Sequence, residues 1–184
     1  MTTVNQVQRP DETVQIVDAS NNPTGSATRS EMRANNLIHR CSFTMVFNKQ
    51  GELYVQKRVA FKETYASHYD PAPGGVVGAG ESYEENAERE IDEEMGITGV
   101  ELQKQFDFFY SDDVCRLWGR LFSCRYDGDF KLDPDEVESG RFMSLQEVAG
   151  LLRSGPVCPD SWAAVQKYFQ KHAPGLLSPE CSPE

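Results

Sequence analysis

The feature that most constrains this chain is one amphipathic helix, predicted over residues 82–95, which follows a Gly-rich loop. Ser82, with Glu85 three residues later, is the signature of a capping box that starts a helix. Gly96 is suited to the left-handed conformation that ends one. Apolar residues recur every four positions: Tyr83, Ala87, Ile91 and Met95. The chain therefore has to place this face of the helix against a core.

Three glutamates share the arc beside that apolar face. Glu90, Glu93 and Glu94 are spaced i, i+3 and i+4, so they project in similar directions. Like charges at these spacings repel by on the order of a few tenths of a kcal/mol per exposed pair, and the C-terminal end of a helix disfavours anions. Hard divalent cations such as Mg²⁺ bind carboxylate oxygens and offset this repulsion. The pattern predicts a metal site, with a solvated acidic face as the alternative.

The loop and helix together resemble the Nudix box. Gly75, Glu81 and the run Arg89–Ile97 match that pattern at every specified position. The resemblance implies the Nudix fold, an α+β structure in the form of an α/β/α sandwich with a central mixed sheet, in which the box is a loop–helix–loop. It also implies a hydrolase that cleaves a diphosphate bond in a nucleoside diphosphate linked to another moiety, or in a related organic diphosphate, with Mg²⁺ or Mn²⁺ as cofactor.

The same resemblance assigns roles to residues of the box. Glu90, Glu93 and Glu94 are the implied metal ligands, and Gly75 lets its backbone approach the metal. Arg89 is the implied orienting partner of a carboxylate. Water attack on a diphosphate requires a group that takes a proton from the water, and Glu93 or Glu94 is the first choice for that base.

Two pairs of residues outside the box are further candidates. Glu136 and Glu138 lie in a predicted loop region where some family members supply a base or an extra ligand. Arg58 and Lys62 resemble diphosphate-contacting cations of isopentenyl-diphosphate isomerase, a branch of the superfamily that residues 14–25 also resemble. Solvated loop acids and surface charge at a strand end are the respective alternative interpretations.

The catalytic residues of that isomerase are absent. Gly74 and Val76 stand where the isomerase has its cysteine and a metal-binding histidine, and His39 is predicted to be packed or hydrogen-bonded. The chain is similar to bacterial Nudix hydrolases of this branch in the segments 32–35 and 115–119. The sequence therefore favours a hydrolase. An isoprenoid-diphosphate isomerase and a non-catalytic Nudix binding domain remain the alternatives.

The overall charge limits the partners. The chain has 18 Lys and Arg against 29 Asp and Glu, a formal net charge of −11. Such a field repels phosphorylated ligands, so the positive charge for a diphosphate must be supplied locally. The predicted partner is a small-molecule diphosphate, with no nucleic-acid polymer and no membrane; a homodimer is left open.

The start of the chain shows no signal pattern and no apolar stretch has membrane-spanning length, which predicts a cytoplasmic location. Five cysteines without a C-x-x-C pair predict buried free thiols. The aromatic residues at 106–110 and Trp118 are predicted to be core and sheet-face residues, with base stacking as the alternative.

The other elements are predicted mostly as strands. We expect one domain over residues 12–172 between flexible tails at 1–11 and 173–184. Residues 61–80 are predicted to be irregular, and a short helix is expected within 26–36. Helices are also expected after Ser144 and Asp160. Strands are expected at 14–17, 39–48, 53–58, 105–110 and 115–126, and an extended stretch at 137–142.

Overall fold

A mixed sheet forms the centre of the computed structural model, which describes residues 11–177. The strands run in the order β2-β1-β3-β4-β5, while β7 pairs with β3, β6 with β7, and β8 with β4. β3 and β7 are parallel, and the other paired strands are antiparallel. The strands are β1 (Thr13–Val17), β2 (Pro23–Thr28), β3 (Ile38–Phe47), β4 (Leu53–Arg58), β5 (Tyr69–Asp70), β6 (Gln103–Ser111), β7 (Arg116–Arg125) and β8 (Val137–Met143).

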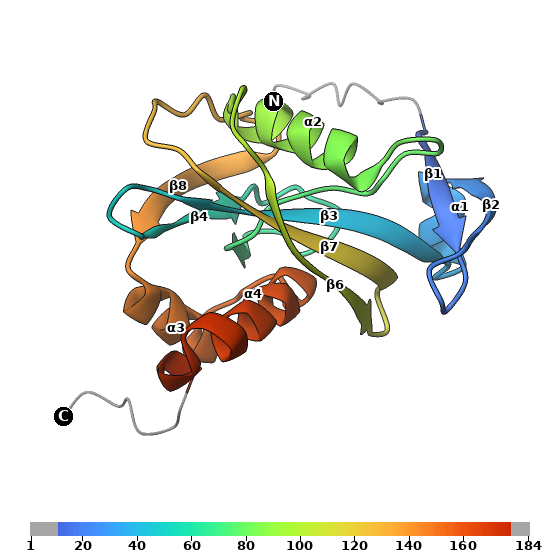
Figure 1. Cartoon of the computed structure of the whole chain (residues 1–184). Helices are drawn as coiled ribbons and strands as arrows, with labels where there is room; N and C mark the ends of the chain where they lie inside the picture. Colours follow the sequence, from blue (N-terminus) through green and yellow to red (C-terminus); the bar gives the residue numbers. More distant parts are fainter. Residues whose placement is uncertain (1–10, 178–184) are drawn as a thin grey trace.

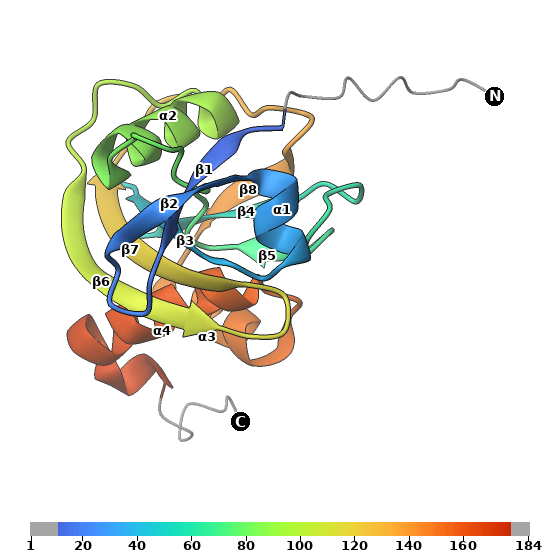
Figure 2. The same ribbon diagram turned by 90° about the vertical axis from the view of Figure 1, so that its right-hand side faces the viewer.

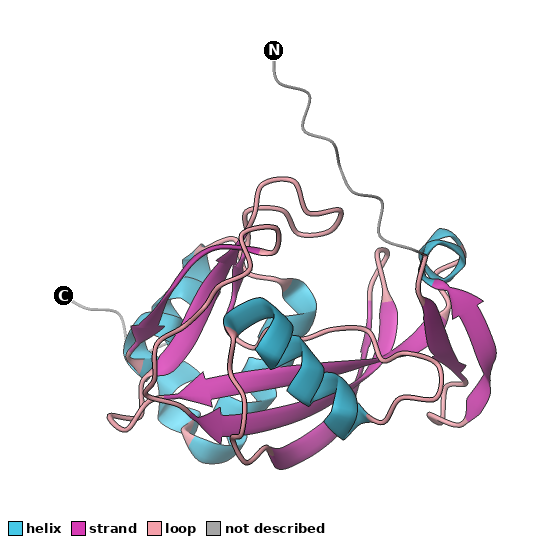
Figure 3. Cartoon of the chain, turned by 90° about the horizontal axis from the view of Figure 1, so that it is seen from above, coloured by secondary structure: helices cyan, strands magenta, loops and turns pink. Residues whose placement is uncertain are grey.

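Helices cover both faces of this sheet. Figure 1 shows α2 on one face and α3 and α4 together on the other, while the short α1 lies with β1 and β2 at one end. The view from above in Figure 3 shows α2 lying across the central strands. The helices are α1 (Arg29–Ala34), α2 (Tyr83–Met95), α3 (Leu145–Ser154) and α4 (Pro159–His172), followed by a 3₁₀ turn, η1 (Pro174–Leu177). The α+β sandwich with a central mixed sheet is confirmed.

The alternation of side chains along β3 explains the two layers. Successive residues of a strand point to opposite faces. Phe43 and Met45 belong to the apolar cluster that includes residues of α3 and α4. Val46 packs with Ile91 of α2, and Ser42 donates a hydrogen bond to Asn86 of the same helix. One strand therefore builds an apolar contact on one face and a partly polar contact on the other.

Helix α2 begins and ends as the sequence predicts. The Ser82 hydroxyl accepts a hydrogen bond from the Glu85 N–H, and the Glu85 carboxylate accepts one from the Ser82 N–H. Gly96 adopts φ = 68°, the left-handed conformation. The last turn is also fastened from outside. The Lys131 N–H donates to the Met95 carbonyl at 2.9 Å, and the Asp133 N–H donates to the Glu94 carbonyl at 3.0 Å.

The short helix predicted within residues 26–36 is confirmed, but the strand that precedes it was not predicted. Residues 23–28 form β2, which pairs with β1 in register from Thr13↔Thr28, and only Arg29–Ala34 is helical. Figure 2 shows α1 beside this hairpin. The sequence of β2 has no alternation of apolar and polar residues because the strand is largely exposed, so its pairing with β1 left no pattern to detect.

Two further segments differ from expectation. Within the stretch predicted to be irregular, Tyr69–Asp70 forms β5 beside β4. The tail predicted from residue 173 starts too early, because residues 174–177 form η1, whose Leu176 and Leu177 pack against the α3–α4 cluster. The tail predictions for residues 1–10 and 178–184 lie outside the described residues.

Candidate active site

The three glutamates of α2 occupy different environments. Glu94 is 6% exposed, the Glu90 side chain is 15% exposed, and the Glu93 side chain is 55% exposed. The helix turns Glu90 and Glu94 towards the sheet and leaves Glu93 at the rim, as their spacing along one arc predicts. Two carboxylates are thus removed from water at the same end of one helix.

The Gly-rich loop lies directly against Glu90. A Cβ atom added to Gly75 would collide with the Glu90 carboxylate, so only glycine allows this approach without a shift. The Gly75 carbonyl accepts a hydrogen bond from the Ser42 N–H at 3.0 Å, which fixes the loop to β3. This contact places the backbone of residue 75 beside the Glu90 carboxylate.

Arg89 connects the loop to two of the glutamates. Its guanidinium donates to Glu81 Oε1 at 3.0 Å and to Glu93 Oε2 at 3.1 Å, and it lies 2.9 Å from Glu90 Oε1. These hydrogen bonds and charges raise the pKa of Arg89. Burial raises the pKa of Glu90, and the charge of Arg89 opposes that effect. Arg89 therefore orients the carboxylates, as predicted from its place in the motif.

Glu94 is held by a buried side chain of the sheet. Gln56 of β4 is 1% exposed and donates from Nε2 to Glu94 Oε2 at 2.7 Å. Burial raises the pKa of Glu94 to about 7, and the hydrogen bond from Gln56 acts in the opposite direction. The charges of Glu90 and Asp70 raise it further. A carboxylate that can hold or release a proton near neutrality thus faces the sheet.

Asn86, on the same helix, joins the loop, the sheet and the helix. It is fully buried, accepts from the Ser42 hydroxyl at 2.6 Å, and donates to the Val76 carbonyl and to Glu81, each at 3.0 Å. Glu81 also accepts from the Gly78 N–H at 2.8 Å. These bonds fix the loop that carries Gly75, so Glu81 has a structural role here.

The other predicted residues divide between the two faces of the sheet. Lys62 pairs with Glu136, and its pKa is lowered to about 8 by burial while the charges of Glu94 and Glu90 raise it. Glu138 pairs with Lys57 at 2.8 Å. Lys57 follows Gln56 in β4, so it points to the face away from Glu94. The structure therefore brings Lys62 and Glu136 towards the glutamates and separates Glu138 from them.

The donor chemistry of this region fits a hard divalent cation. Burial raises the pKa of both Glu90 and Glu94, so neighbouring groups do not fully compensate the negative charge of these carboxylates. Glu93 lies one turn away with an exposed side chain. Residues 11–177 contain no group of three or more acidic, histidine or cysteine side chains already converged on one point. Arg89 and Gln56 instead hold the carboxylates.

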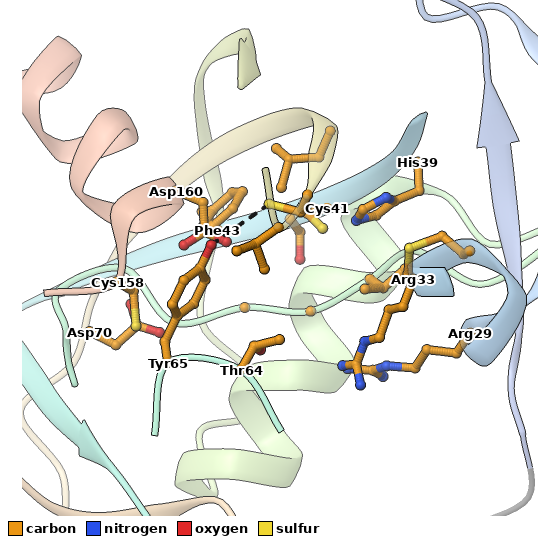
Figure 4. Close-up of a pocket in the computed structure, with 18 of the residues that line it drawn as sticks. Arg29, Arg33, His39, Cys41, Phe43, Thr64, Tyr65, Asp70, Cys158 and Asp160 are labelled. Carbon is orange, nitrogen blue, oxygen red and sulfur yellow. Dashed lines mark hydrogen bonds between the residues drawn. The ribbon is translucent and has the colours of Figure 1, made fainter. Parts of the chain in front are cut away.

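A pocket of about 110 Å³ opens beside Gly75 (Figure 4). Arg29 and Arg33 of α1 reach in from one side, while Asp70 and Asp160 lie on the other. The walls come from α1, the loop 59–68, the start of β7 and the first turn of α4. Arg58 also lines the pocket, 3.8 Å from Asp70. Of the two predicted substrate-binding cations, Arg58 thus lies in the pocket wall.

Sequence reasoning missed several residues of this region. Gln56 and Asp70 come together across the β4–β5 pair, which carried no pattern in the sequence. Arg29 and Arg33 are four apart on a short helix, so they share one face, and that spacing was the available signal. Asp160 was noted only as a residue at the start of α4. Only the folded chain brings these segments to one cavity.

His39, the cysteines and the aromatic residues can be compared with their predicted environments. His39 is 3% exposed and bonds through Nδ1 with the Leu37 carbonyl at 3.0 Å, which confirms a packed, hydrogen-bonded histidine. The four described cysteines are free, and all except Cys115 are buried; Cys181 lies outside the described residues. Phe108 is in the core as expected, while Phe109 is 42% exposed and packs against Trp118.

Comparison with known proteins agrees with this geometry. The NUDIX domain model matches residues 38–164. An uncharacterized Nudix hydrolase of Pseudomonas aeruginosa is 39% identical over 158 residues, covering 86% of this chain and 94% of the relative. One from Yersinia pestis is 37% identical over 161 residues, covering 88% of this chain and 87% of the relative.

Solved structures show the same architecture. The crystal structure of DR0079 from Deinococcus radiodurans superposes with a TM-score of 0.75 at 20% identity, covering 85% of this chain and 98% of that one. The fold and the glutamate helix define a hydrolase of the pyrophosphatase type. The chain belongs to the Nudix family, whose members generally use divalent metals and bind small-molecule diphosphates. Among the described helices none has the length and apolar character to cross a bilayer.

Proposed function

We propose that this protein is a Mg²⁺- or Mn²⁺-dependent hydrolase of the diphosphate bond in a nucleoside diphosphate linked to another moiety, or in a related organic diphosphate. The observation that carries the proposal is the pair of carboxylates withdrawn from solvent, Glu90 and Glu94, of which Glu90 lies against Gly75 in the wall of a pocket that arginines also line. Glu90, Glu93 and Glu94 would hold the cation, with the backbone of Gly75 alongside. The cation would neutralise charge that develops on the phosphate oxygens.

The reaction adds water to one phosphorus and breaks the bridging P–O bond, so the water must lose a proton. Glu94 or Glu93 is the proposed base, because Glu94 has a pKa of about 7 and Glu93 is accessible at the rim. Glu136 is the second choice, since its partner Lys62 lies within the field of both buried glutamates. Glu138 is not retained as a base, because its partner Lys57 points to the other face.

Arg89 would act as a positioning residue. Its bonds to Glu81 and Glu93, and its contact with Glu90, restrict the rotamers of the carboxylates before any substrate arrives. Arg58 and Lys62 are proposed to compensate the negative charge of the substrate. Both lie near the glutamates in a chain whose formal net charge is −11.

The structure argues against isomerase chemistry at this site. A Cβ atom at Gly74 would collide with the backbone carbonyl of Ser42, so a cysteine could not stand there without moving the loop away from β3. Val76 beside it packs against the apolar cluster. The intact set of glutamates argues against a module that only binds, because burying Glu94 has a cost in stability that binding alone does not require.

The test is a hydrolysis screen with matched variants. Purified wild type, Glu93→Gln and Glu94→Gln are assayed with and without Mg²⁺ on nucleoside diphosphate sugars, dinucleoside polyphosphates, NADH, ADP-ribose, CoA and oxidised nucleotides. Glu88→Gln is the control, because Glu88 is an exposed acid of the same helix. We expect both site variants to lose about 10³-fold or more in kcat/KM, a barrier change of about 4 kcal/mol, and the control to keep wild-type rates. Near-normal rates in both site variants would contradict the assignment.

A further inference from the structure

The pocket beside Gly75 has chemically different ends. Gly75 contacts Glu90, so one end of the cavity adjoins the glutamates where the diphosphate would be cleaved. The cavity then continues between β3 and the start of α4 as far as Asp160. In Figure 4 the arginines Arg29 and Arg33 lie on the side of the pocket opposite Asp70 and Asp160.

The arginine side is suited to phosphate. Arg29 pairs with Glu12 at 3.1 Å, and Arg33 pairs with Glu63. Both partners are exposed, with 54% and 76% of their side chains accessible, so these ion pairs stabilise the protein little and can exchange for an anionic ligand. The charge of Arg29 also acts on Glu90, which places Arg29 within electrostatic range of the glutamates.

The side of the pocket opposite the arginines has an excess of acceptors. Asp70 is 6% exposed and accepts from the Ala72 N–H at 3.2 Å, with Arg58 at 3.8 Å as its cation. Asp160 accepts from the Ser161 N–H at 2.8 Å and forms no ion pair with a basic side chain of residues 11–177. Arg58 pairs with Asp70 and lies within electrostatic range of Asp160, and its buried Nε has no hydrogen-bond partner within residues 11–177.

A bound ligand could balance the positive charge of the arginines on one side of the pocket and the negative charge of the aspartates on the other. We propose, on the basis of the proposed function above, that this pocket binds the organic group of the substrate, and that Asp160 with Asp70 recognises an amino group on it. The substrate class is therefore a diphosphate ester whose organic group presents an N–H donor at the end opposite the cleaved bond.

The expected preference for an amino group follows from which groups donate hydrogen bonds and which accept them. An ionised carboxylate only accepts hydrogen bonds, so it attracts an amino group and repels a carbonyl oxygen in the same place. Cytosine and uracil differ in this way, since the exocyclic amino group of one is replaced by an oxygen in the other. A hydrogen bond to a charged group contributes roughly 1.5–3 kcal/mol, which corresponds to a preference of about tenfold or more.

The N–H donor has two sources, a nucleobase or an amino alcohol, and matched pairs distinguish them. Hydrolysis with Mg²⁺ is compared for CDP against UDP, ADP against IDP, and 2-aminoethyl diphosphate against propyl diphosphate. Assays are run at about pH 8, above the pKa of about 6 to which burial raises Asp160, so that this carboxylate is ionised. Calorimetry with CDP and UDP measures binding independently of turnover.

The variant is Asp160→Asn, which keeps the shape of the side chain and removes its charge. The control is Asp113→Asn, an exposed acid in a nearby loop with the same change of charge. We expect wild type to prefer the amino-bearing member of at least one pair by about tenfold or more in kcat/KM. Asp160→Asn should lose that preference, while Asp113→Asn keeps it.

The outcomes separate this inference from the proposed function. A loss of rate in Asp160→Asn that is equal for both members of a pair indicates a structural role and overturns the inference, as does equal wild-type activity within every pair. Absence of hydrolysis with every compound overturns the proposed function. Tighter binding of CDP than UDP in that case, lost in Asp160→Asn, would still support recognition of the amino group.

Discussion

The two faces of the central sheet are built from different kinds of side chain. The face under α3 and α4 carries an apolar cluster in which Met45, Leu53 and Phe169 are fully buried. The face under α2 also has apolar clusters, but it buries polar groups as well, among them Ser42, Thr44, Gln56, Asn86 and Glu94. Burying polar and charged groups lowers stability unless each finds a partner. One face of the sheet is thus mainly apolar, whereas the other combines apolar packing with the polar groups that are proposed to carry the chemistry.

The largest expected effect is on the apolar face. Phe169→Ala removes a fully buried ring from α4 and should reduce the free energy of unfolding by about 3–5 kcal/mol. Urea denaturation measures this loss. The folded fraction should keep wild-type kcat/KM, because Phe169 contacts none of the glutamates. Lys171→Ala, on the exposed side of the same helix, is the control. A large loss of kcat/KM per folded molecule in Phe169→Ala would show that the apolar face also contributes to activity.

The next effect concerns the pH dependence of stability on the α2 face. Burial raises the pKa of Glu94 to about 7 from an ordinary value of 4.5. The folded state therefore binds this proton more tightly than the unfolded state, so the stabilisation is complete below about pH 4.5 and is lost as the pH rises through about 7. We expect metal-free wild type to lose on the order of 2 kcal/mol across this range relative to Glu94→Gln.

Denaturation of both proteins in EDTA, at pH values between about 4.5 and 8, measures that difference. Glu88→Gln again serves as the control, because Glu88 is exposed. Stability curves of wild type and Glu94→Gln that stay parallel over the whole range would show that the buried carboxylate does not distinguish this face from the other.

A smaller effect is expected from the buried amide of α2. Asn86→Ala removes the partners of the buried Ser42 hydroxyl and of the partly buried Val76 carbonyl. The free energy of unfolding should fall by roughly 1–3 kcal/mol, and kcat/KM should also fall because the loop with Gly75 loses its anchor. Measuring both quantities sharpens the comparison: here stability and activity change together, whereas in Phe169→Ala only stability changes.

The smallest effect is expected at Glu138. Its pair with Lys57 is partly exposed, so Glu138→Gln should change stability by less than about 1 kcal/mol. Because this pair faces away from Glu94, we also expect kcat/KM to stay within about twofold of wild type, a difference below about 0.5 kcal/mol. A large loss of activity would return Glu138 to the list of bases and place catalytic residues on both faces.

The glutamate helix could be predicted in detail because its signals are local. The capping residues, the apolar stripe and the spacing of Glu90, Glu93 and Glu94 all lie within a few turns of one helix. Gly75 could be placed beside the site through the motif, and the structure adds the reason, the contact with the Glu90 carboxylate. Local pattern was therefore enough to place the helix, its caps and its three glutamates.

The pocket could not be predicted, because its residues come from segments far apart in the sequence. Arg29, Arg58 and Asp160 meet only after β3 and β4 have paired and α4 has packed beneath them. Nor could the sequence show that Gln56 bonds to Glu94, since strand periodicity predicts a buried residue there but not its partner. Strand β2 was missed for another reason: it is largely exposed, so its sequence shows no periodicity.

The division of the pocket between segments has a consequence for how such proteins diversify. The side chains proposed to recognise the substrate belong to α1, β5 and the first turn of α4, whereas those proposed to cleave it belong to α2. Insertion or exchange in the former segments leaves the bonds that fasten α2 at Lys131 and Asp133 intact. Evolution, or the grafting of new loops, can therefore change which substrate is bound without changing the residues that are proposed to cleave it.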